Sequence, residues 1–289
     1  MLACISLLAV WGLGRQTSLA RVTVHEVAVS EIVPLGVLMG LRSLCAGLAG
    51  FTLLCVYGNA RGFTFRYQDA TVVLRRHTRL TTFTVWCFAL LCGYFLLASL
   101  CSGAVLAGYE ALVPSWLVLG TLILFEMSYP MSLLVSAVVT FVLLPVARRH
   151  QHPTDRLFRW RPLMMHSGNV LMMQLAMLSA PPPMTLAHLP YALLFSCSYA
   201  LFAWYWFWHT GVFYYFFLDY RRPGALWIYL GLVMTIVLLY SLSYGIALLV
   251  HHQDSRWWAY PGLLLFTLSL IRVRAPAPAT EHPPATSPA

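Results

Sequence analysis

Four polar residues at the ends of apolar runs could do chemistry in a membrane: Thr84, His166, Asn169 and His209. His166 and Asn169 are three positions apart, so they share one face of a helix. A threonine hydroxyl next to a histidine that serves as its base could carry out nucleophilic catalysis. Alternatively, Thr84, His166 and Asn169 only form hydrogen bonds between helices, as polar residues commonly do in membrane bundles. The residue types leave both interpretations open.

Three further polar residues lie deep inside apolar runs, Arg42, Glu126 and Gln174, and we expect these three and His209 to be buried. A charge at the centre of a membrane helix costs about 2.5–3.5 kcal/mol on insertion scales. We therefore expect Arg42 and Glu126 to form a buried ion pair, with Gln174 as a third partner. Such a pair would clamp two helices together or lie on a path for protons or substrate.

The composition is that of a multi-pass integral membrane protein. The 289 residues are 60% hydrophobic and only 9% charged, whereas soluble domains carry about 25% charged residues. The formal net charge of +9 comes from arginine, because the chain has no lysine. These arginines lie in short loops between apolar runs, a pattern typical of membrane orientation, so we expect no nucleic-acid partner.

The apolar runs predict an all-α transmembrane helix bundle with six or seven spans. The expected spans are residues 32–57, 80–106, 116–146, 163–179, 186–208 and 226–250, and the short run 257–271 either spans or is re-entrant. Residues 1–31 form an apolar N-terminal segment that could be signal-like. Residues 272–289 are rich in proline and are expected to be disordered.

Arginine alternates between successive loops. Loops 58–79, 147–162 and 209–224 and the tail hold 14 of the 18 arginines, and loops 107–115, 180–185 and 251–256 hold only Arg256. This alternation predicts that the arginine-rich loops are cytosolic. It does not distinguish the plasma membrane from an internal membrane.

Motifs for bound cofactors are absent from the sequence. It has no glycine-rich phosphate loop, no Gly-x-Ser-x-Gly elbow and no HExxH motif, and its histidines lack the neighbours that a metal site requires. We expect no cofactor and no metal. The expected partners are the lipid bilayer and either a lipid ligand or other membrane proteins.

Four stretches resemble known membrane families. RLTTFTVWCFALLCGYFLLA, HSGNVLMMQLAML, LAHLPYALLFSCSYALFAWYWF and YYFFLDYRRPGA occur in this order within residues 79–225. Together they resemble the rolling stone family of polytopic membrane proteins and, more distantly, the androgen-induced membrane hydrolases. The first resemblance implies a membrane protein linked to cell fusion, with no established chemistry. The second implies threonine-dependent hydrolysis of fatty acid esters inside the membrane.

The hydrolase resemblance carries over at two positions and fails at a third. The family threonine matches Thr84, and a second family histidine matches His166, but the catalytic histidine of the family matches Asn169. A neutral amide cannot take a proton, so this chain departs from the hydrolase pattern where the chemistry needs a base. We therefore expect a rolling-stone-like membrane interaction or structural protein. An intramembrane lipid-ester hydrolase is the first alternative, and a transporter that uses Arg42 and Glu126 is the second.

Overall fold

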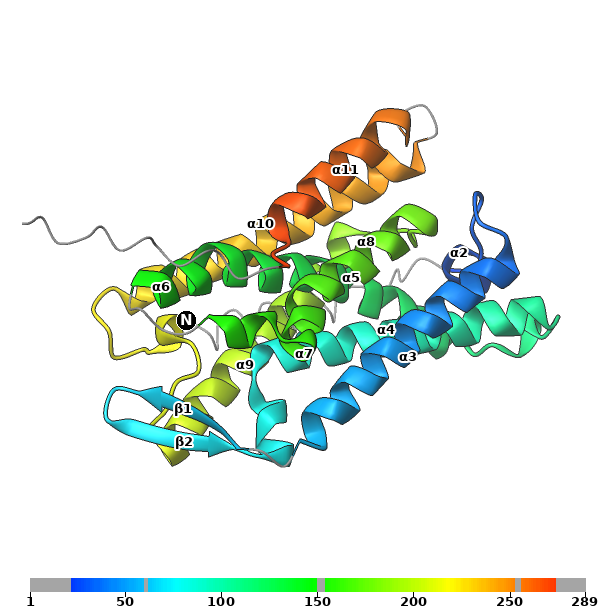
Figure 1. The fold of residues 1–289 in the computed structure, drawn as a ribbon. Helices are drawn as coiled ribbons and strands as arrows, with labels where there is room; N and C mark the ends of the chain where they lie inside the picture. Colours follow the sequence, from blue (N-terminus) through cyan, green and yellow to red (C-terminus); the bar gives the residue numbers. More distant parts are fainter. Residues whose placement is uncertain (1–21, 60–61, 150–153, 253–255, 274–289) are drawn as a thin grey trace, which may run out of the picture.

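A computed structural model describes residues 22–59, 62–149, 154–252 and 256–273. The expected signal-like segment falls mostly within residues 1–21, and the expected disorder of the tail concerns residues from 274 onward, so both lie outside these ranges. The described chain is mostly helical (Figure 1).

Five helices are long and apolar enough to cross a membrane. They are α3 (Leu35–Tyr57), α4 (Phe83–Leu106), α5 with its helical continuation (Ser115–Arg149), α9 with the turn before it (Leu186–Thr210) and α10 (Ala225–His251). Two further helical segments accompany them, and of these the second is a short apolar helix. One is formed without a break by α7 (Trp160–Leu163), the π-helical turn η5 (Met164–Gly168) and α8 (Asn169–Ser179); the other is α11 (Arg256–Leu270).

Proline and glycine set several of the helix boundaries. Pro34 and Pro114 directly precede α3 and α5, where the fixed φ of proline is compatible with a helix start. Helix α9 (Leu189–Thr210) ends at Gly211 and α10 begins after Gly224, and both glycines adopt left-handed backbone angles, with φ of +71° and +78°. The chain therefore reverses direction between α9 and α10 at positions where glycine is the favoured residue.

Helix α5 is the centre of the bundle. Every residue from 125 to 136 is buried, although an ordinary surface helix buries only one stripe. Helices α4, α8 and α10 pack against it, and Figure 1 shows α5 surrounded by these elements. A π-helical turn, η3 (Val139–Leu143), follows α5 and continues into α6 (Leu144–Arg149). Groups that α5 carries in its middle are therefore shielded from lipid on all sides.

The three arginine-rich loops meet at one end of the bundle. Arg161, in the second of these loops, donates from Nη1 to the carbonyl oxygen of Cys55 in the last turn of α3, at 3.0 Å. Tyr67, in the first loop, donates to Asp219 in the third, at 2.7 Å. These contacts place the described parts of loops 58–79, 147–162 and 209–224 on the same side of the helices.

The arginine-poor segments meet at the opposite end. His25, in the short helix α2 (Val24–Ala28), contacts Glu110 with 3.0 Å between Nε2 and Oε2. Ser30 donates to the carbonyl of Ser179 at the end of α8. Tyr260 in α11 donates to the carbonyl of Leu178 at 3.2 Å. The alternation of arginine in the sequence therefore corresponds to two ends of the folded bundle.

The expectation of an all-α fold is wrong for residues 63–74. Strands β1 (Phe63–Tyr67) and β2 (Ala70–Leu74) pair antiparallel, with Phe63 opposite Leu74 and Tyr67 opposite Ala70 (Figure 1). This segment counts as a basic loop when only its arginines are considered. Its β-branched and aromatic residues on either side of a short polar turn are, however, a hairpin pattern.

Candidate functional site

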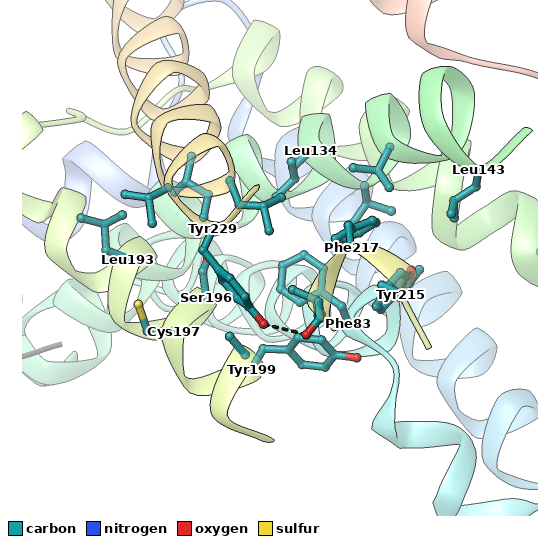
Figure 2. A pocket seen from close by; sticks show the side chains of 18 of the residues that line it. Phe83, Leu134, Leu143, Leu193, Ser196, Cys197, Tyr199, Tyr215, Phe217 and Tyr229 are labelled. Atoms are coloured by element: carbon teal, nitrogen blue, oxygen red, sulfur yellow. Dashed lines mark hydrogen bonds between the residues drawn. The ribbon is translucent and has the colours of Figure 1, made fainter. Parts of the chain in front are cut away.

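An apolar chamber of about 90 Å³ lies between α4, α5, α9, α10 and the segment that joins α9 to α10. Figure 2 shows its side chains pointing toward a common space. The lining comprises Phe83 and Thr84 of α4; Leu134, Val135 and Val138 of α5 with Val139 and Leu143 of η3; Leu193, Ser196, Cys197, Tyr199 and Ala200 of α9; Tyr215, Phe217 and Leu218 of the joining segment; and Tyr229, Leu232, Val233 and Ile236 of α10. One water molecule needs about 10–15 Å³ by this measure, so the chamber has room for a larger group.

The hydroxyl groups around the chamber have partners within the protein. Tyr229 donates to the carbonyl of Leu218 at 2.7 Å. Tyr199 donates to the carbonyl of Thr81 at 3.2 Å, and Ser196 donates to a carbonyl one turn earlier in α9. A hydroxyl that is already bonded offers little to a polar ligand, so the space mainly presents carbon surface.

Thr84 lines the chamber with its side chain half-buried. Its Oγ1 lies 3.4 Å from the hydroxyl oxygen of Tyr215, and burial raises the pKa of that tyrosine above its ordinary value. A phenol with a raised pKa is a proton donor rather than a base at neutral pH. The described residues that line the chamber include no histidine and no carboxylate, which are the side chains that usually activate a threonine hydroxyl.

His166 and Asn169, the other candidates for catalysis, lie apart from this chamber. His166 lines a separate small cavity of about 10 Å³, together with Ser136, Thr140 and Ser167. Its backbone carbonyl accepts a hydrogen bond from the Ser136 hydroxyl. The side-chain Oδ1 of Asn169 is occupied by the backbone N–H of Val170, at 2.7 Å. The structure does not bring the predicted threonine–histidine pair together around the chamber.

The predicted ion pair between Arg42 and Glu126 is wrong. The Arg42 side chain is 3% exposed, and its Nη1 donates to Ser102 at 2.6 Å and to the carbonyls of Ala28 and Ala98 at 3.2 and 3.4 Å. A serine hydroxyl and two backbone carbonyls therefore satisfy the Arg42 charge. Sequence spacing does not reveal backbone partners of this kind. The transporter hypothesis therefore loses the pair on which it depended.

Glu126 pairs instead with His188 of the turn η6 (Leu186–His188). Oε2 of Glu126 lies 2.5 Å from Nδ1 of His188, and both side chains are almost fully buried. Oε1 of Glu126 accepts the backbone N–H of Thr185 at 2.7 Å. The Thr185 carbonyl in turn accepts the hydroxyl of Tyr240 from α10, at 2.9 Å. The carboxylate thus ties the loop after α8 to the centre of the bundle.

Gln174 and His209, the remaining predicted polar sites, have separate surroundings. Gln174 is buried, and its Oε1 accepts the hydroxyl of Tyr129 at 2.9 Å; it contributes to neither buried charge. The expectation that His209 is buried is wrong. His209 is exposed in the last turn of α9, with its ring 4.4 Å from that of Tyr205 and 4.8 Å from that of Trp208. Because His209 lies in the last turn of α9, at the rim of the bundle, its side chain is exposed.

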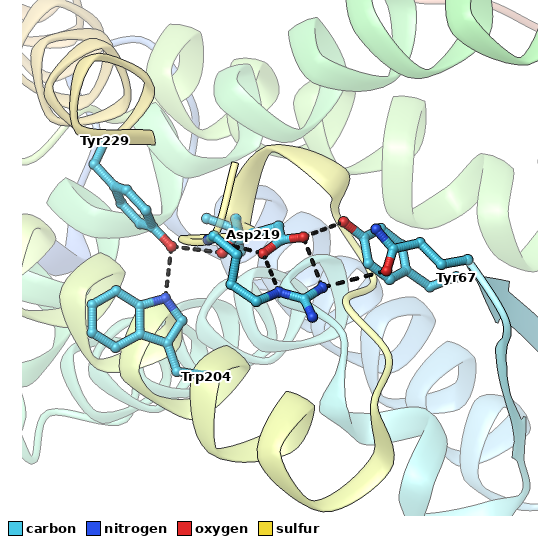
Figure 3. Close-up of polar contacts among 7 residues, drawn as sticks. Tyr67, Trp204, Asp219 and Tyr229 are labelled. Atoms are coloured by element: carbon cyan, nitrogen blue, oxygen red, sulfur yellow. Dashed lines mark hydrogen bonds and ion pairs between the residues drawn. The ribbon is translucent and has the colours of Figure 1, made fainter. Parts of the chain in front are cut away.

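A polar latch holds the segment between α9 and α10 against the hairpin (Figure 3). We use this name for Tyr67, Gln68, Asp219 and Arg221. Tyr67 donates to Oδ2 of Asp219 at 2.7 Å, and Arg221 donates to both carboxylate oxygens at 2.9 and 3.0 Å. Nη2 of Arg221 also lies 3.5 Å from Oε1 of Gln68 at the hairpin tip. Leu218, next to Asp219, lines the chamber, so the latch fixes one of its walls.

The electrostatics of the latch follow from these bonds. The hydrogen bonds from Arg221 and Tyr67 lower the pKa of Asp219 to about 2, although its burial acts in the opposite direction. Burial and the bond to Asp219 raise the pKa of Tyr67. Asp219 is therefore ionised at neutral pH while its side chain is only 2% exposed. A buried, ionised carboxylate is stable in this position only while Arg221 and Tyr67 donate hydrogen bonds to it.

Sequence reasoning does not identify the His188 pairing, the latch or the chamber. The chamber and the latch join residues that are far apart in the chain. The sequence feature that points to the latch is Asp219, the acidic residue just before the two arginines of YYFFLDYRRPGA. The resemblance to rolling stone proteins and to androgen-induced hydrolases stays a prediction. No family model, no curated protein and no solved structure matches this chain.

Proposed function

We propose that six helices cross the membrane fully, namely the five long helices and the helix 160–179, and that α11 is a short seventh span. The contacts at the two ends of the helix 160–179 support its crossing. It begins near Arg161 at the arginine-rich end and finishes at Leu178 and Ser179, which contact the arginine-poor end. Helix α11 returns toward the rich end, where the Leu270 carbonyl accepts from Thr140 at 2.7 Å. Its fifteen residues cover about 22 Å, less than the roughly 30 Å hydrocarbon core, so it would cross only with local adjustment.

We further propose that the protein is a rolling-stone-like membrane interaction protein whose chamber holds an apolar part of a membrane lipid without converting it. The observation that carries this proposal is the lining of the chamber: it is built from apolar side chains, and its tyrosine and serine hydroxyls are bonded within the protein. Ligand sites in proteins are typically apolar cavities with few polar groups. An acyl chain matches this lining, whereas a sugar or a nucleotide would leave its polar groups unpaired.

Photolabelling tests the chamber. The purified chain in neutral detergent is mixed with a fatty acid that carries a photoreactive group near the end of its chain, and the labelled residues are mapped. We expect label on α5, α9 and α10 at the chamber. Val233→Phe should reduce it several-fold, because the larger ring fills the space that Val233 lines.

Leu238→Phe is the matched control, since Leu238 lies on the same helix and is 63% exposed. It should leave the chamber label unchanged. Equal labelling of the chamber in the native chain and the Val233→Phe variant would refute the proposal.

Thr84 supports one alternative function. Its hydroxyl side chain lines the chamber, so an ester held there could meet a nucleophile, as in the threonine-dependent hydrolases. The missing base weighs against this function, because removal of a general base typically costs about 10²–10⁴ in rate. We therefore place the hydrolase second.

A further inference from the structure

The hydroxyl groups of Thr84 and Tyr215 differ from the other hydroxyls of the chamber. Those of Ser196, Tyr199 and Tyr229 donate to backbone carbonyls at 2.9, 3.2 and 2.7 Å. The oxygens of Thr84 and Tyr215 lie 3.4 Å apart, which is long for a bond between hydroxyls. Within the described part of the chain, neither of the two donates to a backbone carbonyl. The pair carries two hydrogens and makes one weak bond, so one hydrogen can be donated to a ligand.

The chamber is elongated along the helices. Leu193 and Ala200 line it on α9, and Tyr229 and Ile236 line it on α10. The two residues on each helix are seven positions apart, so the chamber extends over about 10 Å. Figure 2 shows Leu193 and Tyr215 on opposite sides of the lining. The weakly bonded hydroxyl pair therefore lies at one end of the space.

This end of the chamber is the end nearer to the arginine-rich loops. Thr84 is the second residue of α4, which follows the first of these loops, and Tyr215 lies in the third. Ile236 is the twelfth residue of α10, about 16 Å from the start of that helix. Since the hydrocarbon core is about 30 Å thick, the apolar end of the chamber lies near its middle. The chamber thus has the same polarity gradient as one leaflet of a bilayer.

The volume of the chamber is that of one narrow chain. About 90 Å³ are available, and one water molecule needs about 10–15 Å³ by this measure. The chamber therefore holds about six to nine groups of the size of a water molecule. Over a length of about 10 Å, this number corresponds to a single row of carbon atoms.

We propose that the chamber binds a single-chain lipid with an oxygen acceptor in its head, such as a fatty acid. The head accepts a hydrogen bond from Thr84 or Tyr215, and the chain extends toward Leu193 and Ile236. A carboxylate suits this end, because hydrogen bonds to a charged acceptor are the stronger ones. The inference rests on the proposed function, since it concerns the same chamber, and it adds the class of lipid and its direction.

Two photoreactive fatty acids test the direction in the purified full chain in neutral detergent. One carries its reactive group next to the carboxyl group, and the other carries it at the end of the chain. The first should label Phe83, which adjoins Thr84, and Phe217, whose ring lies 5.5 Å from that of Tyr215. The second should label residues around Leu193 and Ile236.

The possible outcomes separate this inference from the proposed function. Label of similar strength at exchanged positions, or spread evenly along the chamber by both probes, would overturn the direction alone. Label from neither probe in the chamber would overturn the proposed function as well.

Thr84→Val with Tyr215→Phe tests the position of the head. This double variant removes both hydroxyls and keeps the approximate shape of the side chains. Competition against the probe that reacts at its chain end measures the affinity for decanoic acid. This affinity should fall about tenfold, which corresponds to about 1.4 kcal/mol of hydrogen bonding, while the affinity for decane stays the same. Tyr215→Phe alone should lower it about threefold and covers the case in which the double variant fails to fold.

Thr235→Val with Tyr205→Phe is the matched control, because it removes the same two hydroxyl types from exposed positions on α10 and α9. Its affinity for decanoic acid should stay within about twofold of the native chain. Equal losses in the two double variants, or an unchanged affinity in Tyr215→Phe, would overturn the position of the head. Dioctanoyl phosphatidylcholine, which has two chains, should compete far more weakly than decanoic acid, and equal competition would overturn the single-chain class.

Discussion

At the scale of single residues, Arg42 and Glu126, two of the buried charged residues of this bundle, are satisfied in different ways. Arg42 uses a serine and two backbone carbonyls, whereas Glu126 uses a histidine and a backbone N–H. Neither charge needs the other, so a reversal of both should not restore a fold that one reversal damages.

Glu126→Ala should strongly destabilise the protein, because it leaves the buried His188 and the Thr185 N–H without their partner. Loss of one member of a buried pair typically costs about 3–5 kcal/mol. The chain offers a control in Glu110→Ala, since the His25–Glu110 pair is about half exposed and exposed pairs contribute about 0–1 kcal/mol. Melting temperatures in detergent compare the two, and equal shifts would contradict the role of Glu126 as an internal tether.

Asp219→Asn should destabilise the latch at neutral pH by about 1–2 kcal/mol, discounted because Arg221 is partly exposed. The folded pKa of Asp219, about 2, lies below its ordinary value of 3.8. The stabilisation is therefore complete above about pH 4 and is lost as the pH falls toward 2. The melting temperatures of the native chain and the variant should converge over this interval. Asp155→Asn, on an exposed turn, should show no such convergence, and a constant gap for Asp219→Asn would refute the assignment.

At the scale of elements, the joining segment between α9 and α10 depends on two glycines that differ in their surroundings. A Cβ added at Gly211 would lie 3.2 Å from the Cβ of Ala70 in the hairpin, whereas one added at Gly224 would meet nothing within 4 Å. The hairpin therefore approaches α9 closely at Gly211.

Gly211→Ala should cost more stability than Gly224→Ala. Both variants place alanine in a left-handed conformation, which costs about 1 kcal/mol, but only the first also pushes against the hairpin. Thermal unfolding in detergent measures the difference. A larger loss at Gly224 would show that the hairpin does not pack on α9 as described.

The apolar helices could be predicted from the sequence, but which face of each helix is buried could not. Length and hydropathy locate the long helices of the bundle. Each is apolar around its whole circumference, so periodicity does not tell a lipid-facing leucine from a buried one. Only the depth of polar residues within the apolar runs then suggests which of them are partners. Depth pairs Arg42 with Glu126, which is the wrong partner. The partner of Glu126, His188, lies beyond three prolines in a loop, where helix geometry makes no prediction.

At the scale of the whole molecule, the contacts at the two ends make the membrane topology testable. Cysteines introduced singly at Gln68 and Asp155 should react with an impermeant reagent from the same side of sealed vesicles, because both loops meet at the arginine-rich end. A cysteine at Glu110 should react only from the other side. Reaction of positions 68 and 110 from one side would contradict the proposed spans.

The central claim is that the chamber holds a lipid chain without converting it, and ester turnover by the purified protein tests this claim most directly. A fatty acid ester is incubated with the native chain, with Thr84→Ala and with Leu238→Phe. We predict that the ester is bound and recovered intact in all three, because Thr84 lacks a base. Hydrolysis by the native chain and by Leu238→Phe that disappears in Thr84→Ala would contradict the account.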